Sequence, residues 1–127
     1  MLVFSKIQKG TTLKLNAFAK INLFLEILGK RDDGFHELVT VMQEIDLADV
    51  LSFEEAERGV ALVCDDPDIP VNDDNLICKA ANLLKERKGV GKGVKISLNK
   101  KIPVGAGLGG GSSDAATTLR GLNKIWG

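Results

Sequence analysis

The sequence predicts an α+β fold in which helices lie on one face of a largely antiparallel sheet. Before Pro67 the apolar residues mostly alternate with polar ones, which is typical of strands with one buried face. After Asp74 two stretches repeat apolar residues at helical spacing, and another alternating stretch, Val94–Ile102, lies between them. This order, without an internal repeat, favours one layered domain, which also suits a length of 127 residues.

The composition is that of a globular protein without a strong electrostatic bias. Hydrophobic residues make up 44% and charged residues 27% of the chain, and 17 Lys and Arg residues balance 17 Asp and Glu residues. We therefore expect no general affinity for nucleic acid or for membranes. Cys64 and Cys78 are too few for a paired Cys-x-x-Cys metal site and are interpreted as reduced. Residues 1–10 do not resemble a signal peptide, and a cytoplasmic location is predicted.

The first long alternation predicts a strand that faces the core with its odd-numbered residues. These are Leu13, Leu15, Ala17, Ala19, Ile21, Leu23, Leu25 and Ile27. An unbroken strand of this length would extend to about 50 Å. We therefore expect a break near Ala17–Ala19. Lys20 and Asn22 would share the face that points away from the core, where solvated strand residues are the ordinary interpretation.

The middle of the chain predicts short strands and then a helix. Gly29–Gly34 is interpreted as a loop, and strands are expected at Val39–Ile45, Asp49–Glu54 and Gly59–Val63. After the loop Pro67–Asp74, Asp73 or Asp74 could cap a helix. That helix would carry Leu76, Ile77, Ala80, Leu83 and Leu84 on one side and end at Gly89. A last helix is expected from the stripe Ala115, Leu119, Leu122 and Trp126.

A glycine-rich stretch, Pro103–Ala116, lies between the last predicted strand and the last predicted helix. Five of its fourteen residues are glycine. Glycines let successive backbone amides converge on an anion, and the start of a helix offers unpaired N–H groups and the positive end of its dipole. Ser112 and Ser113 add hydroxyl donors. The stretch therefore predicts a phosphate-binding loop for a nucleotide, although a turn in which glycine only permits tight packing is the structural alternative.

Two known phosphate loops can be compared with this stretch. A Walker loop needs a lysine directly after its second glycine, and no lysine lies between Lys101 and Lys124. Gly105-x-Gly107-x-x-Gly110 does match the dinucleotide fingerprint, but the acidic residue required about twenty positions later is absent. A dinucleotide-binding fragment of an oxidoreductase remains an alternative, as does a non-catalytic assembly module.

Three motifs together carry a family resemblance. They are Pro103-x-Gly105-x-Gly107-Leu108-Gly109-Gly110-Gly111-Ser112-Ser113-Asp114-Ala115-Ala116, Ala19-Lys20-Ile21-Asn22-Leu23 and Asp33-Gly34-Phe35-His36-Glu37-Leu38. They resemble the kinase superfamily named for galactokinase, homoserine kinase, mevalonate kinase and phosphomevalonate kinase. The three motifs and their order resemble those of one branch of this superfamily. That branch phosphorylates a hydroxyl of 4-diphosphocytidyl-2-C-methyl-D-erythritol in non-mevalonate isoprenoid synthesis. Relatives usually have proline at Phe18 and tyrosine at Phe35.

The resemblance implies a site for ATP, with Mg²⁺ shielding the phosphates and no metal ligand identified. The implied ATP-binding residues are Pro103, Gly105, Ala106, Gly107, Leu108, Gly109, Gly110, Gly111, Ser112 and Ser113, with Asn75 and Lys100 at the adenine end. Lys20 would be catalytic, while Asn22, Phe35 and His36 would bind the cytidine substrate. From position alone, Phe35 could instead be a core anchor and His36 a surface or hydrogen-bonded residue. Lys100 and Lys101 could form an exposed basic strand end, and Asp114 could cap the helix or satisfy its dipole.

The resemblance also implies a ribosomal protein S5 domain 2-like fold and a longer enzyme. Residues 1–127 would be its amino-terminal ATP- and substrate-binding domain, truncated before a second domain and before the aspartate that handles the nucleophile's proton. We therefore expect the isolated chain to have little or no kinase activity. Surface left by the missing domain would favour self-association.

Overall fold

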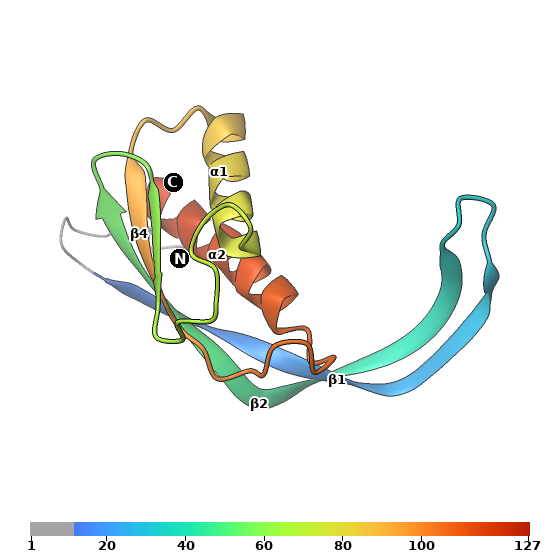
Figure 1. Ribbon diagram of the computed structural model, residues 1–127. Helices are drawn as coiled ribbons and strands as arrows, with labels where there is room; N and C mark the ends of the chain where they lie inside the picture. The colour runs from blue at the N-terminus through green and yellow to red at the C-terminus, as the bar shows by residue number, and fades with distance from the viewer. Residues whose placement is uncertain (1–11) are drawn as a thin grey trace, which may run out of the picture.

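The computed structural model describes residues 12–127 as one four-stranded sheet and two helices. In chain order the elements are β1 (Leu13–Lys30), β2 (His36–Ala56), β3 (Val60–Cys64), α1 (Leu76–Lys88), β4 (Gly93–Asn99) and α2 (Gly110–Trp126). The strand order is β1-β2-β4-β3, and only the β3–β4 pair is parallel. Figure 1 shows both helices on the same face of the sheet. The predicted α+β class and the largely antiparallel sheet are confirmed.

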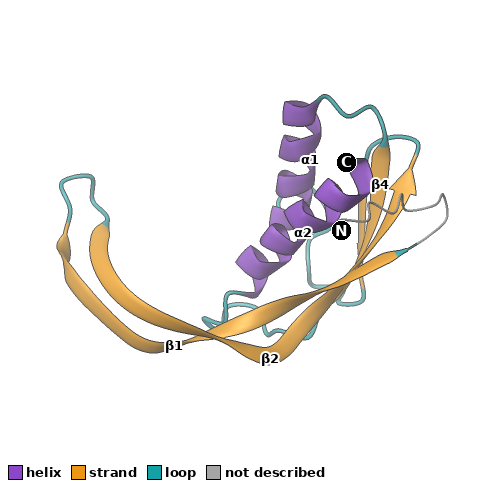
Figure 2. Cartoon of the chain, turned by 180° about the vertical axis from the view of Figure 1, so that it is seen from behind, coloured by secondary structure: helices purple, strands orange, loops and turns teal. Residues whose placement is uncertain are grey.

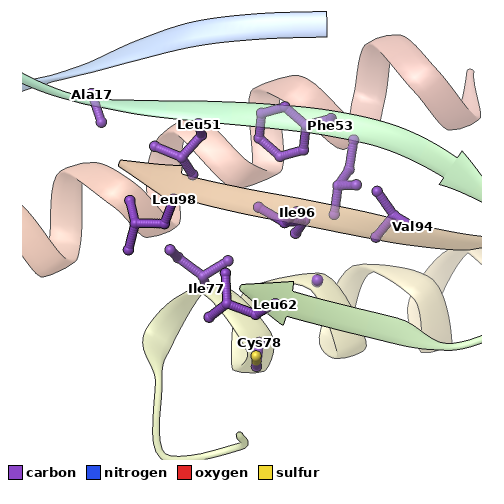
Figure 3. Close-up of a cluster of buried hydrophobic side chains, with 11 residues drawn as sticks. Ala17, Leu51, Phe53, Leu62, Ile77, Cys78, Val94, Ile96 and Leu98 are labelled. Carbon is purple, nitrogen blue, oxygen red and sulfur yellow. The ribbon is translucent and has the colours of Figure 1, made fainter. Parts of the chain in front are cut away.

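The core lies between the sheet and the two helices. Alternation places Leu51 and Phe53 of β2 beside Val94, Ile96 and Leu98 of β4 on the face that the helices cover. The remaining buried members of this cluster are Ala17, Leu62, Ile77, Cys78, Ala81 and Leu122 (Figure 3). Each of the two helices therefore contributes to one shared core with the central strands.

Strand β2 corrects the prediction of separate strands at Val39–Ile45 and Asp49–Glu54. The backbone stays extended throughout, but its pairing with β1 shifts where Phe18 pairs with Ala48 and Lys20 with Glu44. Such a bulge changes which side chains face the core without ending the strand. The break predicted in β1 near Ala17–Ala19 lies at the same place. The strand is continuous there, and the structure shows a register shift in place of a break.

Beyond this bulge, β1 and β2 continue as a two-stranded arm, residues 20–47, which extends past the helices (Figures 1 and 2). The odd-numbered residues expected to face the core leave it here. Ala17 and Ala19 are fully buried, whereas the side chains of Leu23 and Ile27 are 62% and 64% exposed. The buried-face prediction therefore holds only up to Ala19, because beyond it the arm extends past the helices that cover the rest of the sheet.

Local sequence signals predicted the ends of the helices better than they predicted which helix residues are buried. Asn75 is the N-cap of α1, with its Oδ1 accepting from the Ile77 amide at 2.8 Å, so the expected Asp73 or Asp74 cap is wrong. Gly89 closes the helix with φ 64°, as predicted. Exposed members of the predicted stripes are Leu76, Leu83 and Leu119. Among residues 12–127, neither helix combines the length and apolarity that crossing a membrane requires.

Helix α2 crosses β2 closely because it has a glycine at the contact. A Cβ atom at Gly121 would lie 2.6 Å from the Phe53 ring, and that ring is fully buried. We predict that Gly121→Ala lowers the free energy of unfolding by about 1–3 kcal/mol, because the overpacking outweighs the better helix propensity of alanine. Gly91→Ala is the control, since its Cβ would meet nothing within 4 Å. Urea denaturation of both variants tests this, and equal stabilities would contradict it.

Candidate functional site

The glycine loop, residues 103–109, ends at a helix start that has no side-chain cap. Gly105, Gly107 and Gly109 have φ of 73°, 74° and 69°, values that residues with a Cβ rarely adopt. Gly109 is the N-cap of α2 and makes no side-chain cap bond, and the first turn of α2 carries no acidic residue. No acidic side chain within the first turn therefore offsets the positive end of this helix.

The first amides of α2 are available to a ligand. The Ser113 amide donates to the Gly109 carbonyl at 2.9 Å. Within residues 12–127, the amides of Gly110, Gly111 and Ser112 donate to no protein acceptor. Three unpaired N–H groups at the end of a helix dipole form a site suited to an anion.

A hollow of about 390 Å³ opens beside these amides. The glycine loop and the first turn of α2 line one part of it, and Asn75, Leu76 and Lys100 line another. Two residues predicted at the adenine end of ATP therefore share the hollow with the predicted phosphate loop. The Asn75 side chain is already engaged, because its Nδ2 donates to the Pro70 carbonyl at 2.9 Å while its Oδ1 caps α1.

Lys20 joins the glycine loop to strand β1. Its amide donates to the Leu108 carbonyl and its Nζ to the Gly107 carbonyl, each at 2.9 Å. Its aliphatic chain lies against Gly109, where a Cβ atom would be 3.1 Å from the Lys20 Cε. Asn22 is next to it, with Oδ1 3.4 Å from the Lys20 Nζ. Lys20 is therefore not the solvated strand residue that position alone suggested, and its ammonium lies at the edge of the loop.

Beneath the loop lies a buried charged cluster formed by Asp49, Lys100 and Asp114. The Lys100 Nζ donates to Asp49 Oδ2 at 2.7 Å and to Asp114 Oδ2 at 3.2 Å, and the three side chains are at most 8% exposed. Asp49 Oδ1 also accepts from the amides of Lys101 and Ile102. Lys100 is therefore not an exposed strand end, and Asp114 does not cap the helix, whereas Lys101 is exposed as that alternative expected.

Sequence reasoning missed Asp49, although its position contained a signal. Asp49 shares its strand face with Leu51 and Phe53, which are both fully buried. An acidic residue on the core side of an alternating strand needs a buried partner, because an unpaired charge there is costly. Which basic residue supplies that partner depends on how β2 meets the segment after β4, and the sequence pattern does not specify that contact.

The two acids of the cluster differ in pKa because their surroundings differ. Burial alone would raise the pKa of Asp49, but the adjacent Asp114 carboxyl and the hydrogen bonds donated by the Ile102 amide, Lys100 and the Lys101 amide together lower it. Burial raises the pKa of Asp114 to about 7, the neighbouring Asp49 adds to this, and Lys100 offsets only part of it. Burial also opposes the charge on Lys100, yet the two acids raise the pKa of its ammonium. This difference arises because Asp49 receives the backbone donors.

Phe35 and His36 lie where β1 and β2 join at the tip of the arm, and Figure 2 shows that this tip is far from the helices. The Phe35 ring is 71% exposed, so the alternative of a core anchor is wrong, and His36 is exposed as well. The structure does not bring these two residues into the hollow that Asn75 and Lys100 line. Their predicted contact with a cytidine base remains a prediction.

Comparison with known proteins identifies the part of the chain that contains the loop. The family described as GHMP kinases N terminal domain matches residues 75–127, which include α1, β4, the glycine loop and α2. Residues 75–127 are therefore similar to the N-terminal domain of GHMP kinases. The chain is 54% identical over 114 residues to a 4-diphosphocytidyl-2-C-methyl-D-erythritol kinase of Thermoanaerobacter pseudethanolicus and 56% identical over 117 residues to one of Synechococcus.

Solved structures of GHMP kinases agree with the fold. The crystal structure of a 4-(cytidine 5'-diphospho)-2C-methyl-D-erythritol kinase matches 90% of this chain with a TM-score of 0.80 and 42% identity. A homoserine kinase of Cytophaga hutchinsonii matches at a TM-score of 0.72 and 20% identity, which supports the fold alone.

The chain spans about two fifths of the length of these GHMP kinases. Its matches cover 39% and 38% of the two curated relatives and 41% of the first solved structure. The relatives are kinases, so the dinucleotide-binding and assembly-module alternatives are not favoured.

The buried cluster makes a strong prediction for stability. Asp49→Ala removes the partner of Lys100 and of two backbone amides, which leaves buried donors unsatisfied. We expect the free energy of unfolding to fall by about 3–5 kcal/mol. Asp68→Ala is the matched control, because Asp68 is exposed and lies outside the cluster. Denaturant unfolding measures both, and a loss for Asp49→Ala no larger than that of the control would contradict the assignment.

A second prediction concerns the pH dependence of stability. The pKa of Asp114 is raised from 3.8 to about 7 in the folded chain, so its contribution is fully present below pH 3.8 and is lost as pH rises through about 7. Asparagine at this position cannot titrate. Between pH 3.8 and about 7, the free energy of unfolding of the wild type should therefore fall relative to that of Asp114→Asn as the pH rises. Above pH 7 the difference between the two proteins should stay constant. Urea unfolding across pH tests this, and a constant difference between the two proteins would refute it.

Proposed function

We propose that this chain is the ATP- and substrate-binding portion of a kinase that phosphorylates a hydroxyl of 4-diphosphocytidyl-2-C-methyl-D-erythritol. The observation that carries the nucleotide part is the set of unpaired amides at Gly110, Gly111 and Ser112 beside an open hollow. The substrate part rests on the names of relatives that are more than half identical to the chain. The same names support a role in isoprenoid precursor synthesis, and we propose that the chain acts in the cytoplasm.

In this proposal the residues around the loop bind and position the phosphates. The α2 amides and the amides of the glycine loop would receive the phosphate oxygens, with Asn75 and Lys100 toward the adenine end. Lys20 would stabilise negative charge on the transferred group, since its ammonium already lies within 2.9 Å of the loop carbonyl at Gly107. Phosphoryl transfer depends mainly on positioning and electrostatics, which these groups supply.

Substrate recognition is assigned to the arm. Asn22 would orient the substrate next to Lys20, and its Oδ1 is held by the Thr40 hydroxyl at 3.2 Å. Phe35 would stack on the cytosine and His36 would hydrogen-bond its edge. Both side chains are exposed in the described structure, so they are accessible to a ligand.

Mg²⁺ would enter this site together with ATP. Within residues 12–127 no group of three or more His, Cys, Asp or Glu side chains gathers to hold a metal ion, and the first turn of α2 carries no acid. Mg²⁺ that serves phosphoryl transfer is held largely by substrate phosphates and water, where it neutralises their charge. We therefore assign no protein ligand to it.

The proposal treats residues 1–127 as one domain of a longer kinase. Because the chain spans about two fifths of its relatives, it should bind nucleotide more readily than it turns over substrate. The exposed apolar side chains of the arm offer a surface through which isolated chains would self-associate.

Nucleotide binding can be tested by thermal shift. MgATP should raise the melting temperature of the chain, NAD should not, and Gly109→Val should abolish the ATP effect. Valine cannot readily adopt φ 69°, and its Cβ would press against the Lys20 side chain at 3.1 Å. Gly91→Val is the control, since its Cβ has open space. Stabilisation by NAD in place of ATP would overturn the kinase assignment. If a folded Gly109→Val variant were still stabilised by ATP, the glycine loop would not be the nucleotide-binding site.

Turnover is tested separately. We expect little or no ADP release from the isolated chain with MgATP and the cytidine substrate, because the proton-handling aspartate expected of the family lies outside residues 1–127. ADP release at a rate near that of a full-length relative, and lost in Lys20→Ala, would show that the chain is sufficient for catalysis.

A further inference from the structure

The buried charged cluster lies directly under the first residue of the phosphate-binding helix. A Cβ atom at Gly110 would be 3.0 Å from the Lys100 Nζ and 2.9 Å from the Ile102 Cγ2. Gly110 is itself buried, and its amide is one of the three available to an anion. Asp114, one helical turn further along α2, contacts the same ammonium at 3.2 Å. The cluster is therefore adjacent to the proposed phosphate site, and Lys100 and Asp114 line the same hollow as the glycine loop.

The charges of the cluster do not balance when both acids are ionised. Asp49 and Asp114 then carry two negative charges against the single positive charge of Lys100. The other charged groups face different partners: Lys20 of β1 donates to Gly107 across the loop, and Asp65 after β3 accepts from the Lys100 amide. The Lys101 side chain, from the segment after β4, is exposed. An excess negative charge therefore remains under the helix start.

Asp114 is the member that can remove this excess by binding a proton. Both Asp49 oxygens accept from Lys100 or from backbone amides. Asp114 Oδ1, by contrast, is buried and has no hydrogen-bond partner in the described chain. An ionised oxygen without a donor is costly in such a place, so protonation of Asp114 costs the cluster less than protonation of Asp49.

We propose that Asp114 is a positioning residue of the nucleotide site and takes up a proton when a polyphosphate binds at the glycine loop. This rests on the proposed function of that loop. A bound polyphosphate brings several negative charges to the helix start, and like charges disfavour ionisation of a nearby acid. By linkage, protonation of Asp114 must strengthen polyphosphate binding by the same factor. A neutral cluster leaves the positive end of α2 unopposed by charge beneath it.

The proposal gives a specific pH profile. MgATP affinity should be nearly constant where Asp114 is protonated in the free chain, and it should weaken as pH rises above its free-state pKa of about 7. The steepest slope allowed for one proton is about tenfold per pH unit. In Asp114→Asn, which keeps a neutral side chain of the same shape, the affinity should stay constant over that range.

Calorimetric titration of the chain with MgATP measures the proton uptake when it is repeated in buffers of different ionisation enthalpy. A pH near 7.5 is suitable, because it lies about half a unit above the pKa of Asp114. We expect the wild type to take up a fraction of a proton and Asp114→Asn to take up none. Asp68→Asn, an exposed acid elsewhere, should behave as the wild type. If Asp114 had a purely structural role, Asp114→Asn would change the MgATP affinity equally at every pH and would leave the proton uptake unchanged. Equal uptake in wild type and Asp114→Asn would overturn the proposal.

A measurement on the unsubstituted chain keeps the proposal testable if Asp114→Asn fails to fold. NMR titration of labelled aspartate carboxyls should show Asp114 titrating near 7 without ligand and at higher pH with MgATP. Titration near the ordinary value of an aspartate would overturn the proposal whatever the ligand does. MgATP binding without a shift would overturn it and leave the proposed function intact. No MgATP binding at all would remove the proposed function, and this inference with it.

Discussion

The ion pair of Lys100 with Asp49 and Asp114 is the interaction on which the arrangement of the site depends. It joins three segments that are distant in sequence: strand β2, the turn after β4 and helix α2. The two backbone amides that Asp49 also accepts fix the path of the chain into the glycine loop. Because these groups are buried, each must keep its partners, and the cluster therefore restrains where α2 begins.

A second attachment holds the same loop from the other side. Lys20 binds the loop through its backbone amide and through its ammonium, at the point where the β1–β2 pairing shifts register. The bulge thus serves two purposes, since it starts the arm and directs Lys20 toward the loop. A functional loop positioned by rigid neighbours is a common solution, because loop backbone by itself holds few fixed contacts. Here the neighbours are a strand bulge and a buried ion pair.

The arm presents a different physical problem. A two-stranded ribbon with apolar residues exposed on it is marginal in water unless something packs against it. In the described chain the arm extends past both helices (Figures 1 and 2), and Phe35 and His36 lie where β1 and β2 join at its tip. The relatives are longer than this chain, which is why the activity and the role of the arm are proposed for the whole kinase.

Local patterns in the amino-acid sequence determined much of this protein. The alternation predicted the strands and most of the sheet, Gly89 predicted a helix end, and the glycine density between strand and helix predicted a loop whose backbone suits an anion, because each depends on the backbone within a few residues. The tertiary structure decided which faces are buried and which charges meet. The core side of β1 ends at Ala19, and Asp49 meets Lys100 and Asp114. Such contacts depend on how distant segments pack, which periodicity within one segment does not encode.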